Sequence, residues 1–238
     1  PDASPLPHYP HESLKTRMNS RQHWEDLYQK KDESDVSWFQ LHPDHSLHLI
    51  RAVRLQKSDA IIDIGGGASR LVDHLLDDGL SDVTVLDIAE NGLEQARVRL
   101  GGRSRAVHWI VADITRWRPE RSYRLWHDRA VFHFLADPID RTAYKCCLES
   151  ALMPGGTAIL ATFAPDGPTQ CSGLPVERYS PESLADWLGS GFERISSQLE
   201  EHLTPAGNRQ QFQYSVFVKR GTHPVVPASD KGDSGGNN

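Results

Sequence analysis

The sequence is poor in cysteine and has no long apolar segment. Three cysteines among 238 residues cannot all pair with one another, which excludes a small disulfide-stapled scaffold, so we expect reduced thiols and a cytoplasmic location. No apolar run approaches the ~18 residues that a membrane span requires, and residues 1–10 lack the basic and apolar regions of a secretion signal. We therefore expect no membrane partner.

Basic residues are also fewer than acidic ones. The 26 Lys and Arg are outnumbered by 32 Asp and Glu, which gives a formal net charge of −6. A protein that binds nucleic-acid phosphates needs a basic surface, so we expect no nucleic-acid partner. The arginines of residues 97–124 are scattered over several predicted elements, which is typical of solvated faces and leaves a small anionic substrate or an acidic protein substrate open.

The two ends of the chain lack the apolar periodicity of packed elements. Residues 1–17 carry prolines at uneven spacing, and residues 221–238 are made of glycine, proline and polar residues that offer no core contacts. We predict a disordered N-terminal extension over 1–17, one domain over 18–220 and a disordered C-terminal tail over 221–238.

Between the ends, helical and strand periods alternate, as in an α/β fold with crossover helices. A helix capped by Ser20 and another capped near Asp44 precede the first strand. The sequence then predicts strands over 60–64, 83–86, 107–111, 123–127, 157–163, 193–203 and 210–219, with helices over 69–76, 93–100 and 137–152 and from 180. This pattern predicts a mostly parallel seven-stranded sheet that ends in an antiparallel hairpin.

The first predicted strand runs directly into glycines and then into a helix. Glycines at this point, Gly65 to Gly67, let backbone approach a ligand at the carboxyl edge of the sheet, although a tight strand-to-helix turn explains them as well. A dinucleotide fingerprint is disfavoured because Arg70 stands where a small residue is needed. A P-loop is excluded because no Lys-Ser or Lys-Thr follows.

The next two strands end in carboxylates. Asp87 follows the glycines by about 20 residues, where an acid can accept hydrogen bonds from ribose hydroxyls, and the alternative is a helix cap. Asp113 closes the third strand in the same way, within reach of an adenine amino group, and Ile88 and Ile114 are placed to sandwich the ring.

These motifs together resemble the class I S-adenosylmethionine-dependent methyltransferases over roughly residues 20–220. Asp63, Gly65 and Gly67 match the family's first motif, which faces the amino-acid portion of the cofactor. Asp87 matches its ribose-binding acid and Asp113 its adenine-side acid. The resemblance implies S-adenosyl-L-methionine as cofactor and a Rossmann-like, doubly wound fold. Ser69 departs from the pattern, because a third glycine is frequent there.

Two further segments are similar to the thiopurine S-methyltransferase branch of that family. Asp128, Arg129 and Ala130 look like its strand-four motif, with Ala130 in place of a glycine, and this resemblance implies that Asp128 and Arg129 are catalytic residues beside the acceptor. Residues 23–28 and 37–40 look like its N-terminal helical lid. By that likeness Trp24 contacts the cofactor, and Trp38 and Phe39 contact the substrate. Core packing of Trp24 and a structural role of Asp128 are the alternatives.

The sequence therefore predicts an enzyme that transfers a methyl group from S-adenosyl-L-methionine to a small-molecule acceptor, such as a thiol or another soft nucleophile. A protein lysine N-methyltransferase and a non-catalytic cofactor-binding regulatory module are the alternatives. No metal is expected, because the spacing of His127, Asp128 and His133 matches no common zinc motif.

Overall fold

The computed structural model describes residues 11–221, and of residues 11–19 the backbone alone. Most of the predicted extension and tail lies outside these residues, so their predicted disorder stays a prediction. The elements follow in this order: α1 (His11–Lys30), η1 (Glu33–Asp35), α2 (Asp44–Ala52), β1 (Ile61–Ile64), α3 (Leu71–Asp77), β2 (Val83–Asp87), α4 (Glu90–Leu100), η2 (Gly101–Ala106), β3 (Val107–Val111), β4 (Tyr123–Arg129), η3 (Phe132–Phe134), α5 (Pro138–Ala151), β5 (Leu152–Phe163), β6 (Gln170–Cys171), β7 (Leu174–Pro175), α6 (Pro181–Leu188), β8 (Phe192–Leu203) and β9 (Arg209–Lys219).

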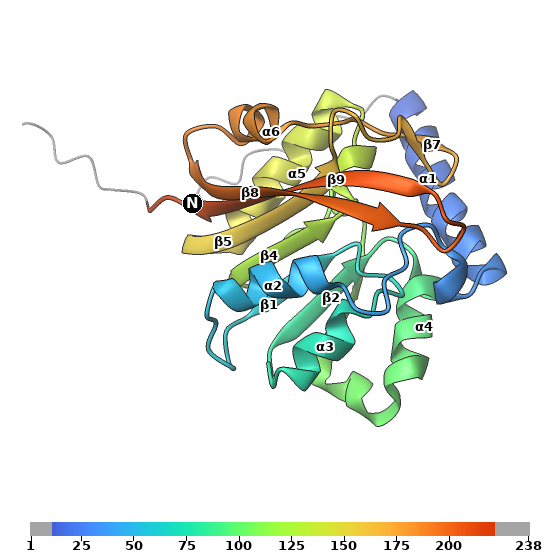
Figure 1. Cartoon of the computed structure of the whole chain (residues 1–238), viewed down its shortest axis with the longest axis horizontal. Coiled ribbons are helices and arrows are strands. Elements are labelled where there is room, and N and C mark those ends of the chain that lie inside the picture. Colours follow the sequence, from blue (N-terminus) through green and yellow to red (C-terminus); the bar gives the residue numbers. More distant parts are fainter. Residues whose placement is uncertain (1–10, 222–238) are drawn as a thin grey trace, which may run out of the picture.

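Seven strands form one twisted sheet in the order β3-β2-β1-β4-β5-β9-β8 (Figure 1). The first five strands along the chain pair in parallel, whereas β9 is antiparallel to β5 and β8 is antiparallel to β9. The predicted Rossmann-like α/β fold with a C-terminal antiparallel hairpin is therefore confirmed.

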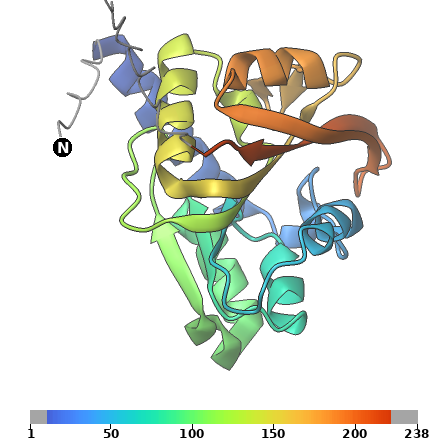
Figure 2. The same ribbon diagram turned by 90° about the vertical axis from the view of Figure 1, so that its left-hand side faces the viewer.

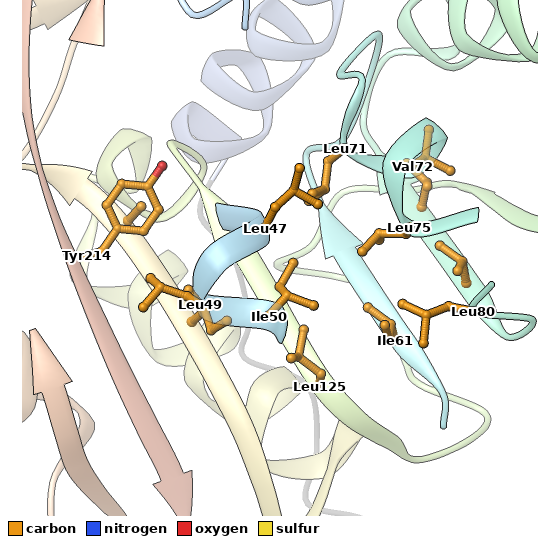
Figure 3. Close-up of a cluster of buried hydrophobic side chains, with 14 of the residues drawn as sticks. Leu47, Leu49, Ile50, Ile61, Leu71, Val72, Leu75, Leu80, Leu125 and Tyr214 are labelled. Atoms are coloured by element: carbon orange, nitrogen blue, oxygen red, sulfur yellow. The ribbon is translucent and has the colours of Figure 1, made fainter. Parts of the chain in front are cut away.

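Helices cover both faces of the sheet, and each face has its own apolar core (Figure 2). On one face, side chains of α2 and α3 such as Leu47 and Leu71 pack on Ile61 and Leu125 of the central strands (Figure 3). On the other face, α5 and α6 pack on alternate residues of the same strands. The central strands are buried from both sides, as parallel strands require.

Helix starts follow the local chemistry that the sequence displays. Asp137 accepts a hydrogen bond from the backbone N–H of Ile139, and Pro138 occupies the first turn of α5, where its missing N–H costs nothing. Ser180 and Ser183 bond reciprocally in a capping box that opens α6.

Two boundaries differ from the predictions. Helix α1 begins at His11, so Ser20 lies inside it and is not its cap; the last proline before it is Pro10, and nothing in 11–30 interrupts a helix. Strand β5 begins at Leu152, five residues before the predicted start at Thr157, with a register shift opposite β4. Within the described residues, no helix is long and apolar enough to cross a membrane.

The chain order reverses between β1 and β4, which are neighbours in the sheet but are separated along the chain by β2 and β3. In doubly wound folds this switch point leaves a crevice at the carboxyl ends of the strands, where ligands bind. Gly65 follows β1 there, and Arg129 and Ala130 lie at the end of β4.

Candidate active site

A cavity of about 210 Å³ lies at the carboxyl ends of the parallel strands. It runs along the tips of β1, β2, β3 and β4 and beneath helix α1. Its walls include the following side chains and glycine: Trp24, Tyr28, Trp38, Gly65, Asp87, Ile88, Asp113, Ile114, Arg129, Val131, Phe134, Cys171 and Phe212. The strand tips that the sequence singled out therefore share one cavity.

Asp87 is buried in this cavity at the tip of β2. Its Oδ1 accepts a 2.8 Å hydrogen bond from the backbone N–H of Ala89, so the helix-capping alternative is part of its role. Burial raises the pKa of the carboxyl to about 7, and the neighbouring charges of Asp63 and Glu25 add to that rise. The site thus holds a poorly solvated acid that forms no ion pair within the described part of the chain, a state that hydrogen-bond donors of a ligand would relieve.

The adenine-side residues lie together at the next strand tip. Asp113 holds its loop in place by accepting bonds from the backbone N–H and the hydroxyl of Thr115, at 2.9 and 2.7 Å. Ile88 and Ile114 line the same part of the wall as Asp113. These residues form an apolar slot with one carboxylate, a suitable lining for a purine.

The N-terminal segment covers the cavity with aromatic rings. Trp24 packs edge-on against Trp38 and Phe134, with ring centroids 5.7 and 5.1 Å apart. Tyr28 is 6% exposed and reaches the glycine loop. The sequence placed Tyr28 in the lid-like segment 23–28 but did not single it out as a wall of the site; its i, i+4 spacing from Trp24 was the available signal.

The glycine loop is shaped by this aromatic cover. Gly65 and Gly67 have positive φ of 66° and 42°, a region that side chains rarely adopt. A Cβ on Gly67 would lie 2.4 Å from the Tyr28 hydroxyl oxygen. The absence of a side chain at Gly67 therefore permits the close approach of Tyr28. Gly67 itself does not line the main cavity.

A second, smaller pocket of about 40 Å³ adjoins the glycine loop. Its walls share Trp38, Gly65 and Arg129 with the main cavity and add Asp63 and Phe39. Phe39 faces this pocket and lies under the guanidinium of Arg70, so it is not a wall of the main cavity where Trp38 is. Both predicted substrate residues thus line the small pocket, and Trp38 alone also lines the main cavity.

Arg70, which argued against a dinucleotide site, fastens the cover to the domain. Glu33 forms ion pairs with both Arg70 and Arg99. Arg99 also pairs with Asp73 at 2.7 Å and donates to the backbone carbonyl of Ala68 in the glycine loop. This partly buried network joins η1, α3 and α4 beside the small pocket.

Asp128 lines neither of these two pockets, so the cavity walls do not support its predicted position beside the acceptor. Side chains alternate along a strand, so Asp128 points to the α5 face of β4 while His127 and Arg129 point to the other. It is 0% exposed. Its carboxylate accepts bonds from the hydroxyl of Tyr144 and the backbone N–H groups of Val131 and Phe132. Burial raises its pKa to about 6.

Arg129 lies at the junction of the two pockets. Its Nε donates to the Tyr214 hydroxyl at 2.9 Å and its Nη1 to the Trp38 carbonyl at 3.2 Å. The guanidinium stacks over Phe212 at 4.4 Å. Its side chain is 10% exposed, and the nearest carboxylate, Glu200, is 3.8 Å from Nη2. A nearly buried cation is therefore fixed at the end of β4.

The known proteins that this chain resembles in sequence are methyltransferases. Residues 61–156 match a family described as a methyltransferase domain. Malonyl-[acyl-carrier protein] O-methyltransferase 2 of Ilyobacter polytropus is 26% identical over 107 residues, 44% of this chain and 40% of that protein. The tRNA U34 carboxymethyltransferase of Actinobacillus pleuropneumoniae is 25% identical over 152 residues, 58% of this chain and 47% of that protein. The matched regions span less than half the length of either relative.

Solved structures share the fold over most of the chain. A methyltransferase from Anabaena variabilis, described as SAM-dependent, superposes with a TM-score of 0.66 at 17% identity, over 85% of this chain and 96% of that one. The 1,6-didemethyltoxoflavin-N1-methyltransferase of Burkholderia thailandensis gives a TM-score of 0.63 at 19% identity, over 93% and 94%. The chain therefore shares the fold of these solved methyltransferases, and its residues 61–156 match a methyltransferase domain. A particular likeness to the thiopurine S-methyltransferase branch is not found among these proteins.

Proposed function

We propose that this protein transfers a methyl group from S-adenosylmethionine to a small-molecule acceptor that reacts as a soft nucleophile, such as a thiol. The observation that carries the proposal is the single cavity that joins an apolar slot with Asp113, the acid Asp87 and the glycine loop to an aromatic chamber beside Arg129. A nucleoside with an amino-acid side arm has matching parts in the same order.

The residues fit this cofactor by their chemistry. Asp87 is a buried carboxyl that offers acceptors to two ribose hydroxyls, and Ile88 and Ile114 offer apolar faces to a purine. Trp24 covers the cavity from above. The small pocket has Asp63 and Glu33 as acids and Arg70 and Arg129 as cations, a balanced set that suits a zwitterionic amino-acid portion.

When bound, the cofactor supplies an electrophilic methyl group on a sulfonium. The protein's part in such a displacement is to hold the acceptor ~3 Å from the methyl and to exclude water. Trp24, Trp38 and Phe134 perform the exclusion through their edge-to-face packing over the cavity. No residue needs to form a covalent bond, so the buried Cys171 in the wall serves packing.

Arg129 favours an anionic acceptor over an ammonium one. A thiol of ordinary pKa ~8.5 is partly thiolate at neutral pH, and a fixed cation nearby enlarges that fraction. A lysine side chain would meet repulsion from the same cation. It would also lack Asp128 as a base, because that carboxylate is buried on the opposite face of β4.

The test is a screen of small thiols, phenols and amines with labelled S-adenosylmethionine, reading release of S-adenosylhomocysteine. We expect turnover with thiols and none with alkylamines. A parallel incubation with cell lysate distinguishes the lysine alternative, because a discrete methylated polypeptide would contradict a small-molecule acceptor. Absence of turnover with every acceptor, together with tight binding of the cofactor, would support the regulatory module instead.

A further inference from the structure

Four buried polar side chains behind the glycine loop form one continuous chain of hydrogen bonds. Asp63 on β1 and His127 on β4 are direct neighbours in the parallel register, and their side chains meet with His127 Nδ1 2.7 Å from Asp63 Oδ1. His127 Nε2 lies 2.9 Å from Ser46 Oγ on α2. Ser46 Oγ lies 3.5 Å from the hydroxyl of Tyr214, which accepts from Arg129.

The chain has one consistent direction. A carboxylate is only an acceptor, so an imidazole that carries one proton and donates it to Asp63 through Nδ1 accepts through Nε2. Ser46 must then donate to His127, which leaves its oxygen to accept from Tyr214. Every donor therefore points from the cation Arg129 toward the anion Asp63. The link between Ser46 and Tyr214 is the longest and the weakest of the four.

The chain is a wall of the small pocket. Ser46, Asp63, His127 and Arg129 all line that space of about 40 Å³, which holds a group of the size of one water molecule or one ammonium. His127 engages Oδ1 of Asp63, while Oδ2 lies 2.7 Å from the position that a Cβ on Gly66 would take. One carboxylate oxygen is thus held from behind, and the other is presented at the glycine loop.

We propose that His127 and Ser46 are positioning residues that orient the Asp63 carboxylate toward the ammonium of the cofactor's amino-acid portion, and that Tyr214 ties this array to Arg129. The inference rests on the proposed function, because it assumes that the ammonium of the amino-acid portion enters the small pocket. A rotated Asp63 would lose its bond to the ammonium while the nucleoside slot at Asp87 stayed intact.

The test compares two ligands that differ only at this end of the cofactor. S-adenosylhomocysteine carries the amino-acid portion, and 5′-methylthioadenosine lacks it. Calorimetry on the full chain gives the dissociation constant of each ligand. The dissociation constant of methylthioadenosine divided by that of S-adenosylhomocysteine is the ratio that isolates what the amino-acid portion contributes. Ser46→Ala should lower that ratio roughly fivefold, the effect of losing one hydrogen bond, and should leave methylthioadenosine binding unchanged.

A matched control separates positioning from general damage. Ser215 is equally buried, and its hydroxyl donates to Gln213 at 2.7 Å on the other face of β9. Ser215→Ala should leave the ratio as in the wild type. The amide of His127→Asn retains a donor toward Asp63. This variant should therefore keep a ratio closer to the wild-type value than His127→Leu does.

The possible outcomes test the positioning role and the proposed function separately. An unchanged ratio in Ser46→Ala, or an equal weakening of both ligands, would overturn the positioning role and leave the proposed function intact. A wild-type protein that binds methylthioadenosine no more weakly than S-adenosylhomocysteine would overturn the placement of the amino-acid portion. Failure of the wild type to bind either ligand would overturn the proposed function itself.

Discussion

The carboxylate of Asp128 accepts a 2.6 Å hydrogen bond from the hydroxyl of Tyr144 inside the core between β4 and α5. The same hydroxyl accepts from the indole of Trp126 at 3.0 Å. Together with its bonds to the backbone N–H groups of Val131 and Phe132, these contacts give Asp128 a structural role at the turn that follows β4. This turn places Val131 and Phe134 in the cavity wall.

Asp128→Asn should therefore lower stability and spare cofactor binding. The amide cannot accept all the bonds that the carboxylate accepts, and a buried mismatch costs about 1–3 kcal/mol. Chemical denaturation measures the loss, and calorimetry with S-adenosylhomocysteine measures binding. Tyr144→Phe, which removes the same bond from its other side, should give a loss of the same order. A stable Asp128→Asn protein with impaired turnover would restore the acceptor-side role that the sequence suggested.

The close contact between Gly67 and Tyr28 makes a second prediction. Gly67→Ala forces a methyl group to within 2.4 Å of the Tyr28 hydroxyl oxygen, so the cover should be displaced and S-adenosylhomocysteine should bind at least tenfold more weakly. Tyr28→Phe in the same chain should recover part of that loss.

Gly101→Ala is the control, because Gly101 has a similar φ of 56° with nothing within 4 Å of a Cβ. The effect of Gly101→Ala on binding therefore measures backbone strain without a steric clash. Equal loss of binding in both alanine variants would show that the cover does not depend on the Gly67 contact.

The raised pKa of Asp87 predicts pH-dependent binding. Ribose hydroxyls donate to an ionised carboxylate, so binding should strengthen as pH rises through about 7 and should release protons below it. Calorimetry in buffers of different ionisation enthalpy counts those protons. Asp87→Asn should flatten the profile, and a wild-type profile that is already flat would contradict the assignment.

The ligand-free protein should show the opposite trend in stability. Because the folded pKa lies above the ordinary value of 3.8, the folded state binds more protons than the unfolded state between 3.8 and about 7. Stability from this group is therefore full below that window and is lost as pH rises through it.

Ala130 stands at a φ of 76°, where a glycine is expected from the motif that the sequence resembles. An L side chain there is strained by ~1–2 kcal/mol, and the extra entropy of glycine in the unfolded chain offsets part of the relief. Ala130→Gly should raise the unfolding free energy by up to about 1 kcal/mol. Ala89→Gly, at a φ of −99°, should lower it. Thermal or chemical unfolding of both variants checks the sign.

The sequence was most informative where the determinants are local. The alternation of strands and helices predicted the sheet, and the acids at strand ends predicted the part of the cavity wall around Asp87 and Asp113, because period and strand direction suffice to bring these two residues to one edge. Ala130 was also recognised as a substitute for glycine.

What the sequence did not reveal depends on contacts between distant segments. The partners of Arg70 are Glu33 and Phe39, and Glu33 is 37 residues away in the chain. His127 was considered for metal binding, and its partner Asp63 is 64 residues away in the chain. The face of β4 on which Asp128 lies could not be decided without the strand register. Such pairings follow from tertiary packing and leave no pattern within a short window.

The central claim is that a nucleoside cofactor lies across the strand tips with its ribose at Asp87. Calorimetric titration of S-adenosylhomocysteine into the wild type, Asp87→Ala and the surface control Asp77→Ala tests it most directly. The account predicts one site per chain in the wild type and the control, and a dissociation constant raised at least tenfold in Asp87→Ala by the loss of charged hydrogen bonds. Equal affinity in all three proteins, or no binding to the wild type, would contradict it.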